Sequence, residues 1–292
     1  MTTADIGVIG GSGLYRLFDE DAESGTGENV SAESVTVETP YGPPSGPIHV
    51  GVVGGRRVCF LARHGEQHRL PPHRVPFRAN IWALASLGVR AIVTSSAVGG
   101  ISDRAVPGTF LVPDQLIDRT NGRPDSFFDR DDVQHLPAAD PFDAVLRTTA
   151  VEALRRAGEA VIPDGVTVVI QGPRFSTRAE SRWYRAAGAD IVNMTQYPEA
   201  VLAAELNIGL VTIAFITDTD AGTVSGDTSE AADAALVLER MASAGPRIRA
   251  AITATVAAIP ADYRPRTLIP EPAVRRVLDA RRVDAVMDGS HR

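Results

Sequence analysis

Apolar and polar residues alternate in blocks along this chain, and the blocks predict where its strands lie. The longest apolar block, residues 210–216, contains no charge and is mostly β-branched or aromatic. A run of this kind is typical of a strand buried on both faces, as in a parallel sheet. Shorter runs, bounded by glycine, proline or small polar residues, predict the other strands at residues 6–9, 48–53, 58–61, 90–94, 110–112, 166–170 and 189–195.

Between these strands the apolar positions recur at helical spacing. This spacing predicts helices over residues 80–87 and 142–157, each ended by a glycine. Further helices are expected at residues 230–244, 246–258 and around 273–278. The alternation of strands and helices predicts an α/β fold, a single domain with a central, mostly parallel mixed twisted sheet flanked by helices. We expect this domain to span residues 1–260, with residues 261–292 as a C-terminal extension.

Composition and charge exclude several classes of protein. Of 292 residues, 29 are basic and 36 acidic, and the net charge of -7 without a Lys/Arg-rich block argues against a nucleic-acid partner. No apolar run reaches the roughly 18 residues that cross a bilayer, and the N-terminus lacks a signal-peptide pattern. The single cysteine, Cys59, fits a reducing compartment. A soluble cytoplasmic protein without membrane association is therefore expected.

Small and polar residues follow the predicted strands, at the edge where an α/β sheet forms its ligand crevice. The strand at 6–9 breaks into the turn 10–13 (GGSG), whose backbone N–H groups are able to face an anion. Residues 95–100 (SSAVGG) are expected to form a second loop of this kind. The first turn lacks the spacing of a dinucleotide fingerprint, and an isolated glycine-rich turn often serves only as a turn.

Arg63 and His64 emerge where the strand at 58–61 stops. A guanidinium fork matches phosphate oxygens and an adjacent imidazole adds a donor, although surface Arg–His pairs are usually inert. On the residues alone, His68 is interpreted as a loop residue rather than a metal ligand. The chain has no HExxH, CxxC or carboxylate-rich calcium loop, so no metal is expected.

Two carboxylates, Asp218 and Asp220, follow the longest predicted strand. If the strand period persists that far, both lie on one side; the alternative is that one caps the next helix and the other is solvated. After the strand at 166–170, Phe175 is placed to stack on a flat base, or else it belongs to the core. Residues 101–143 are too long and too often interrupted by proline for a plain connector, and we expect a lid or a subunit contact there.

Several blocks carry a resemblance to a known family: residues 10–13 (GGSG), 63–68 (RHGEQH), 79–84 (ANIWAL), 172–180 (GPRFSTRAE), 193–195 (NMT) and 217–220 (TDTD). Together they closely resemble the trimeric purine nucleoside phosphorylases, and among these the members that act on 5′-methylthioadenosine. The resemblance implies a homotrimer that takes a nucleoside and inorganic phosphate as substrates and needs no cofactor. It also implies the products adenine and 5-methylthioribose 1-phosphate.

The resemblance assigns a role to each candidate site residue. Phosphate would be held by Ser12, Arg63, His64, Ser96, Ala97 and Thr195. The nucleoside would meet Met194 at the ribose, Phe175 and Ser176 at the base, Ala234, Val237 and Leu238 around the 5′ substituent, and His68 and a neighbouring subunit's His135 elsewhere in the site. Asp218 and Asp220 would face the purine N7 and 6-amino edge as the catalytic pair. Ala234 departs from the family in being smaller than usual.

The chemistry of glycosidic cleavage fits these residues. Positive charge builds on the sugar and negative charge on the departing purine, so the site needs a clamped anion on one side and a proton donor on the other. Asp218 donates to N7 only when protonated, which burial and the charge of Asp220 favour. Adenosine, a 5′-deoxy or 5′-halogenated adenosine and methylthioinosine are alternative substrates. A non-catalytic nucleoside-binding protein is the alternative from another class.

Overall fold

The computed structural model describes residues 4–12, 14, 17–18, 32–130, 132–222 and 231–280. The interpretations placed on Gly13, on residues 223–230 and on the last part of the tail lie outside the described residues. Within them, eleven strands form one mixed sheet. The strands are β1 (Ile6–Gly10), β2 (Glu33–Val35), β3 (Ile48–Val53), β4 (Arg56–Ala62), β5 (Ala91–Gly100), β6 (Phe110–Leu111), β7 (Gln115–Arg119), β8 (Val161–Ile162), β9 (Val166–Ile170), β10 (Ile191–Asn193) and β11 (Gly209–Asp218).

The predicted strands and the α/β fold class are confirmed. The order along the sheet is β2-β3-β4-β1-β5-β10-β9-β7, and β11 pairs with β5 and β6. β1 runs parallel to β4 and β5, and β11 runs parallel to β5, whereas β3 and β4 form an antiparallel hairpin. Every residue of β11 is buried, as the uncharged block at residues 210–216 predicted for most of the strand.

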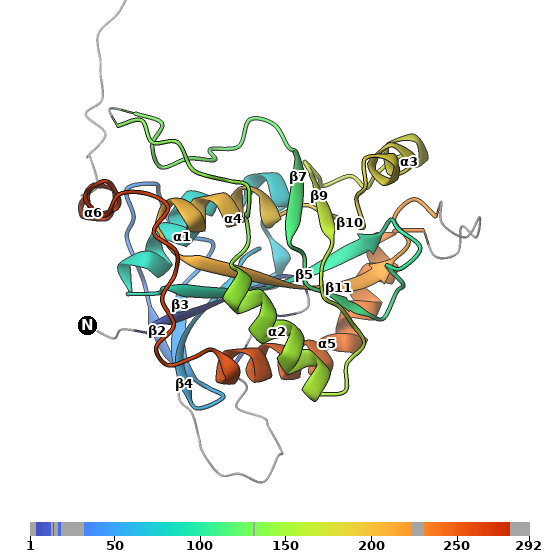
Figure 1. Ribbon diagram of the computed structural model, residues 1–292, viewed down its shortest axis with the longest axis horizontal. Coiled ribbons are helices and arrows are strands. Elements are labelled where there is room, and N and C mark those ends of the chain that lie inside the picture. The colour runs from blue at the N-terminus through green and yellow to red at the C-terminus, as the bar shows by residue number, and fades with distance from the viewer. Residues whose placement is uncertain are drawn as a thin grey trace, which may run out of the picture.

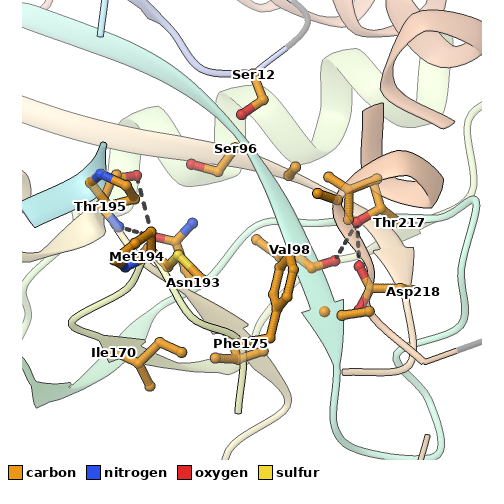
Figure 2. Close-up of a pocket in the computed structure, with 18 of the residues that line it drawn as sticks. Ser12, Ser96, Val98, Ile170, Phe175, Asn193, Met194, Thr195, Thr217 and Asp218 are labelled. Carbon is orange, nitrogen blue, oxygen red and sulfur yellow. Dashed lines mark hydrogen bonds between the residues drawn. The ribbon is translucent and has the colours of Figure 1, made fainter. Parts of the chain in front are cut away.

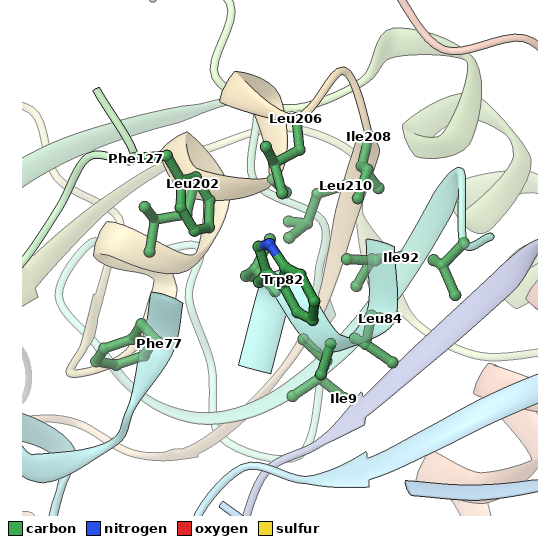
Figure 3. Packing of buried hydrophobic residues seen from close by; sticks show 14 of the residues in the cluster. Ile9, Phe77, Trp82, Leu84, Ile92, Phe127, Leu202, Leu206, Ile208 and Leu210 are labelled. Atoms are coloured by element: carbon green, nitrogen blue, oxygen red, sulfur yellow. The ribbon is translucent and has the colours of Figure 1, made fainter. Parts of the chain in front are cut away.

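The helices cover both faces of this sheet (Figure 1). One face carries α1 (Phe77–Ser86), α4 (Gln196–Glu205) and α6 (Glu271–Asp279), and the other carries α2 (Ala144–Arg156) and α5 (Ala234–Ala258). α3 (Arg178–Ala186) lies to one side of the sheet, next to the part that contains β9 and β10. The short 3-10 turns η1 (Glu66–His68) and η2 (Pro72–Arg74) follow β4. Figure 3 shows Trp82 within the buried cluster of the α1 and α4 face.

The prediction of a loop at residues 95–100 was wrong, because β5 continues through them to Gly100. β5 pairs with β1 as far as Thr94, while its far end pairs with β10 at Gly99 and Gly100. A Cβ on Gly99 would lie 2.8 Å from Asp218 Oδ1, so only glycine lets the strand pass the carboxylate so closely. The small residues of this part of β5 thus allow neighbouring segments to approach the strand closely. Beyond Thr94, β5 no longer pairs with β1.

The prediction of separate helices at 230–244 and 246–258 was also wrong, because α5 is continuous and contains Pro246. A proline inside a helix removes one backbone hydrogen bond and costs about 3 kcal/mol. The buried side chains Met241, Ala244, Ile248 and Ile252 lie on both sides of that position and pack in one cluster against the sheet. Their shared burial outweighs the local cost.

The segment after α5 packs against the face that carries α1 and α4. Trp82 Nε1 donates to the carbonyl oxygen of Val277 in α6 at 2.9 Å. The side-chain oxygen of Asn207 accepts from the amides of Leu268 and Ile269, and its NH₂ group donates to the Ile269 carbonyl. None of the described helices is long and apolar enough to cross a membrane.

Candidate active site

The predicted site residues converge on one cavity of about 290 Å³, close to the lower end of the range for small-molecule pockets. It opens at the carboxyl ends of the central strands, where β1 and β5 separate. The predicted residues that line it are Ser12, Arg63, His64, His68, Ser96, Ala97, Phe175, Met194, Thr195, Asp218, Asp220, Ala234, Val237 and Leu238. Ser176 and His135 are not among its lining residues.

Three of the predicted phosphate residues on the cavity wall, Ser12, Ser96 and Thr195, carry hydroxyl groups. Figure 2 shows Ser12 and Ser96 at one end of the pocket, with Thr195 to one side and Asp218 to the other. The Ser96 hydroxyl is buried without a hydrogen-bond partner among the described residues. Buried polar atoms are rarely left unpaired, so this hydroxyl is suited to a ligand oxygen.

The glycine-rich turn contributes differently from the prediction. Gly11 donates its N–H to Ser95 Oγ at 3.2 Å, so this amide serves the protein rather than an anion. A Cβ on Gly11 would lie 2.5 Å from the Ser95 carbonyl oxygen and 2.8 Å from Arg63 Nη1. Glycine is therefore required here by the close approach of β5 and Arg63, while Ser12 reaches the cavity through its side chain.

Arg63 is held by a partner that the sequence did not indicate. Its Nε and Nη2 donate to the two carboxylate oxygens of Glu199 at 2.8 Å each, and its Nη1 donates to the Ser95 carbonyl at 2.9 Å. Arg63 and Glu199 are both almost completely buried. The bidentate interaction of the guanidinium group is thus made with Glu199. Three of its five N–H groups are used within the protein, and two remain for a ligand in the cavity.

His64 is fixed by the loop that follows it. Its Nδ1 lies 2.8 Å from the Leu70 carbonyl oxygen, and its ring stacks on that of His68 with centroids 4.2 Å apart. Burial, with a smaller contribution from the charge of Arg63, lowers the pKa of His64 to about 3. The imidazole is therefore neutral under ordinary conditions.

The turn after β10 is folded by Asn193. Its Oδ1 accepts from the backbone N–H groups of Thr195 and Gln196 at 2.7 Å each. This bond closes the turn at the start of α4 and holds Met194 and Thr195 on the cavity wall. A short polar side chain that bonds the backbone two residues on is a known turn signal, so this role could have been read from the sequence.

Asp218 ends β11 in a buried, hydrogen-bonded position. Its Oδ2 accepts from the Thr217 hydroxyl at 2.7 Å and its Oδ1 from the Asp220 amide at 2.8 Å. Burial is the main reason why the pKa of Asp218 rises to about 6, and the charge of Asp220 adds to it. The two hydrogen bonds and the charge of Arg240 oppose this rise. The pKa of Asp218 is thus raised as expected, and burial contributes more to this rise than the charge of Asp220 does.

Asp220 lies beyond the end of β11. The two-residue period of a strand therefore does not explain why Asp218 and Asp220 share one side. The backbone of Asp220 is left-handed, with φ of 50°, an uncommon conformation for a residue other than glycine. Both carboxyl groups still line the cavity. Burial raises the pKa of Asp220, and the hydroxyls of Ser181 and Ser176 oppose the rise. Ser176 does not line the cavity, and Asp220 Oδ2 is buried without a hydrogen bond among the described residues.

The remaining wall is apolar. Val237 and Leu238 of α5 contribute to it together with Ala234 at the start of that helix, and Leu238 is 52% exposed. Phe175 is 37% exposed and lines the cavity, so the alternative that it belongs to the core is wrong. α3 begins shortly after Phe175, with a capping box between Thr177 and Glu180.

Residues 5–257 match the model of the Phosphorylase superfamily. The chain is 50% identical to the S-methyl-5′-thioadenosine phosphorylase of Mycolicibacterium smegmatis, over 80% of this chain and 85% of the relative. It is 45% identical to the purine nucleoside phosphorylase of Streptomyces coelicolor, over 88% and 90%. Methylthioadenosine phosphorylase from Schistosoma mansoni in complex with adenine superposes with a TM-score of 0.80 at 34% identity, covering 89% of this chain and 93% of that one. The chain therefore belongs to the phosphorylase superfamily and, within it, to the methylthioadenosine phosphorylases.

Proposed function

We propose that the protein cleaves 5′-methylthioadenosine with inorganic phosphate, giving adenine and 5-methylthioribose 1-phosphate. The observation that carries this proposal is the division of the cavity. Ser12, Ser96 and Arg63 offer donors to an anion in one part, and Asp218 supplies a carboxyl group of raised pKa in another. This is the arrangement that phosphorolysis of a nucleoside needs.

Cleavage would proceed without a covalent enzyme intermediate. A phosphate oxygen attacks C1′ of the ribose as the bond from C1′ to the purine N9 breaks, and Asp218 passes its proton to N7 so that the base leaves neutral. The donors from Ser12, Ser96 and Arg63 hold the anion against the developing positive charge on the sugar. Cavity-lining Met194 and Phe175 would contact the ribose and the base.

Asp220 would select the base. Its Oδ2 is a buried acceptor without a partner in the described part of the chain, and a 6-amino group is a donor that would satisfy it. The oxygen of a 6-oxo purine is itself an acceptor, so it would not form a hydrogen bond with the Asp220 carboxylate oxygen. Leaving buried polar groups unpaired costs about 1–3 kcal/mol each, so 6-aminopurines are expected to be preferred.

The substrate is tested by steady-state kinetics on 5′-methylthioadenosine, adenosine, 5′-deoxyadenosine and methylthioinosine, each with and without phosphate. We expect phosphate-dependent turnover that is fastest on 5′-methylthioadenosine. A hydroxyl placed against Val237 and Leu238 loses water without gaining a partner, which is worth about 1–3 kcal/mol, so adenosine should be at least about tenfold slower in kcat/KM. Cleavage without phosphate would indicate a hydrolase, and binding without turnover a nucleoside-binding protein.

The pH dependence of the nucleoside reaction follows from Asp218. An acid catalyst must carry its proton, and kcat/KM for the nucleoside reports the enzyme before the nucleoside binds. With phosphate saturating, kcat/KM for the nucleoside should therefore fall as the pH rises above about 6, the value to which the pKa of Asp218 is raised. The Asp218→Asn variant should lose this dependence. A rate that increases with pH through this range in the wild type would contradict the assignment.

We also propose a homotrimer in which His135 of one subunit completes the neighbouring site. His135 is exposed and lies outside the cavity of its own chain, and Val133 on the same segment is 72% exposed. An apolar side chain so exposed is suited to a subunit contact. We further propose a cytoplasmic location, which the buried free thiol of Cys59 fits, and a catalytic domain that spans residues 1–260.

Mixed trimers test the role of His135. His135→Ala should lower activity without changing the mass measured by light scattering. Co-expressing His135→Ala with Asp218→Asn should restore part of the activity, because an intact Asp218 in one subunit then meets an intact His135 from its neighbour. A monomeric mass for the active enzyme, or mixed trimers as inactive as the parent variants, would contradict this assembly.

A further inference from the structure

The orientation of the His64 ring is fixed at several points. Nδ1 lies 2.8 Å from the Leu70 carbonyl oxygen, and the Leu70 N–H donates back to the His64 carbonyl at 3.0 Å. Between them, Gln67 and His68 adopt left-handed backbones with φ of 58° and 57°, which non-glycine residues rarely do and which persist only where the surroundings determine them. The His68 ring stacks on the His64 ring at an interplanar angle of 23°.

These contacts determine the tautomer of His64. A carbonyl oxygen only accepts hydrogen bonds, so Nδ1 carries the proton of the neutral ring and Nε2 keeps a lone pair. Among the described side chains, the charged or titratable groups that act on the imidazole are Arg63 and His68, and burial is the largest influence on its pKa, which is lowered to about 3. Glu199 forms a buried ion pair with Arg63. The ring therefore presents an acceptor nitrogen to a ligand.

The other candidate phosphate groups contribute donors. Arg63 has only N–H groups, and the Ser96 hydroxyl is buried without a partner among the described residues. A tetrahedral anion in this cavity thus meets the N–H donors of Arg63, hydroxyl groups that are able to donate, and one nitrogen, His64 Nε2, that only accepts. Hydrogenphosphate, HPO₄²⁻, has three unprotonated oxygens and one P–OH group, which matches that pattern. Sulfate has the same shape and charge but no proton.

We propose that His64 Nε2 accepts the P–OH proton of hydrogenphosphate in a hydrogen bond, and that this contact makes the site select phosphate over sulfate. The inference rests on the phosphate site of the proposed function. It reverses the role expected of an imidazole beside an anion, that of a donor. It also withholds the protonated oxygen from attack, so that an unprotonated phosphate oxygen reacts.

The test measures phosphate and sulfate affinity in the same protein by calorimetric titration at a pH above neutrality, where phosphate is mainly HPO₄²⁻. Hydrogen bonds to charged groups are worth about 1.5–3 kcal/mol, so the wild type should bind phosphate about ten- to a hundredfold more tightly than sulfate. The measurement needs no turnover. Absence of phosphorolysis would defeat the proposed function alone, whereas equal affinity for the two anions would overturn this inference alone.

Two variants of His64 should lower the preference for phosphate by different routes. His64→Gln places an amide near the Nε2 position; its NH₂ group donates to sulfate and its oxygen accepts from P–OH, so sulfate binding should improve and the ratio of affinities should approach one. His64→Asn retains a donor to the Leu70 carbonyl but has nothing at the Nε2 position, so phosphate binding should weaken without a gain for sulfate.

The matched control is His73→Asn, which changes an exposed histidine of the same loop that does not line the cavity. Its ratio of phosphate to sulfate affinity should stay at the wild-type value. Thermal unfolding establishes that each variant is folded before titration. A His64→Gln variant that retains the wild-type ratio would overturn the inference.

Discussion

Asp218→Asn is expected to lower kcat/KM for 5′-methylthioadenosine by at least about two orders of magnitude, the low end of what a general acid contributes. The asparagine amide cannot give a proton to N7, so the purine would have to leave as an anion. The NH₂ group can donate a hydrogen bond to a 6-oxo oxygen, and the activity on methylthioinosine relative to 5′-methylthioadenosine should therefore rise. Steady-state kinetics on the two nucleosides measure both effects.

The structure indicates that this variant will fold. The asparagine oxygen is able to accept from the Asp220 amide, as Asp218 Oδ1 does now at 2.8 Å. Its NH₂ group is able to donate to the Thr217 hydroxyl, whose own proton then turns to the Val98 carbonyl at 3.2 Å. Replacing a group of raised pKa by a neutral one also removes the cost of burying its charge. A loss of activity in Asp218→Asn would therefore reflect the missing proton donor and not a failure to fold.

Asp220→Asn is the matched control. It leaves the Asp218 carboxyl group in place and alters only the acceptor that faces the base, so the loss should be that of one buried polar contact, about 1–3 kcal/mol or roughly ten- to a hundredfold. The fall of kcat/KM above pH about 6 should persist in this variant, because Asp218 still supplies the proton. Full activity of Asp218→Asn on 5′-methylthioadenosine would show that Asp218 is not the acid.

One physical rule allows the sequence to predict that distant residues come together in one site. Parallel strands end at the same edge of a sheet, so residues that follow separate apolar runs come together there. Arg63 follows β4 and Asp218 ends β11, and both of these strands run in the same direction as β5. Ser96 lies within β5, and Thr195 follows β10, which runs antiparallel to β5; all four residues line one cavity. No contact between them had to be known in advance.

What the sequence did not predict depends on contacts between distant segments. Ser95 and Ser96 look like a loop until their pairing with β11 is known, and Pro246 looks like a helix break until the cluster around it is known. Glu199 looks like an ordinary acid in the first turn of a helix, although it lies 136 residues from its partner Arg63. One local signal was available for it, an acid followed directly by the run 200–204, which is wholly apolar.

Glu199→Met is expected to lower the free energy of unfolding by about 3–5 kcal/mol, the usual effect of removing one partner from a buried ion pair. Methionine has a similar volume and favours helix, so neither a cavity nor a loss of helix propensity accounts for the change. The cost arises because the guanidinium of Arg63, 1% exposed, keeps its charge and loses both bonds to the carboxylate. Urea denaturation of the variant and the wild type measures it.

The double variant Arg63→Met/Glu199→Met separates stability from function. Replacing both members of a buried pair by apolar side chains of similar volume is often neutral or stabilising, so the double variant should unfold within about 1 kcal/mol of the wild type. Its kcat/KM for phosphate should nevertheless stay far below that of the wild type, because the guanidinium protons that face the cavity are gone. If the double variant is less stable than Glu199→Met, the pair stabilises the fold directly. If it turns over phosphate normally, Arg63 does not hold the anion.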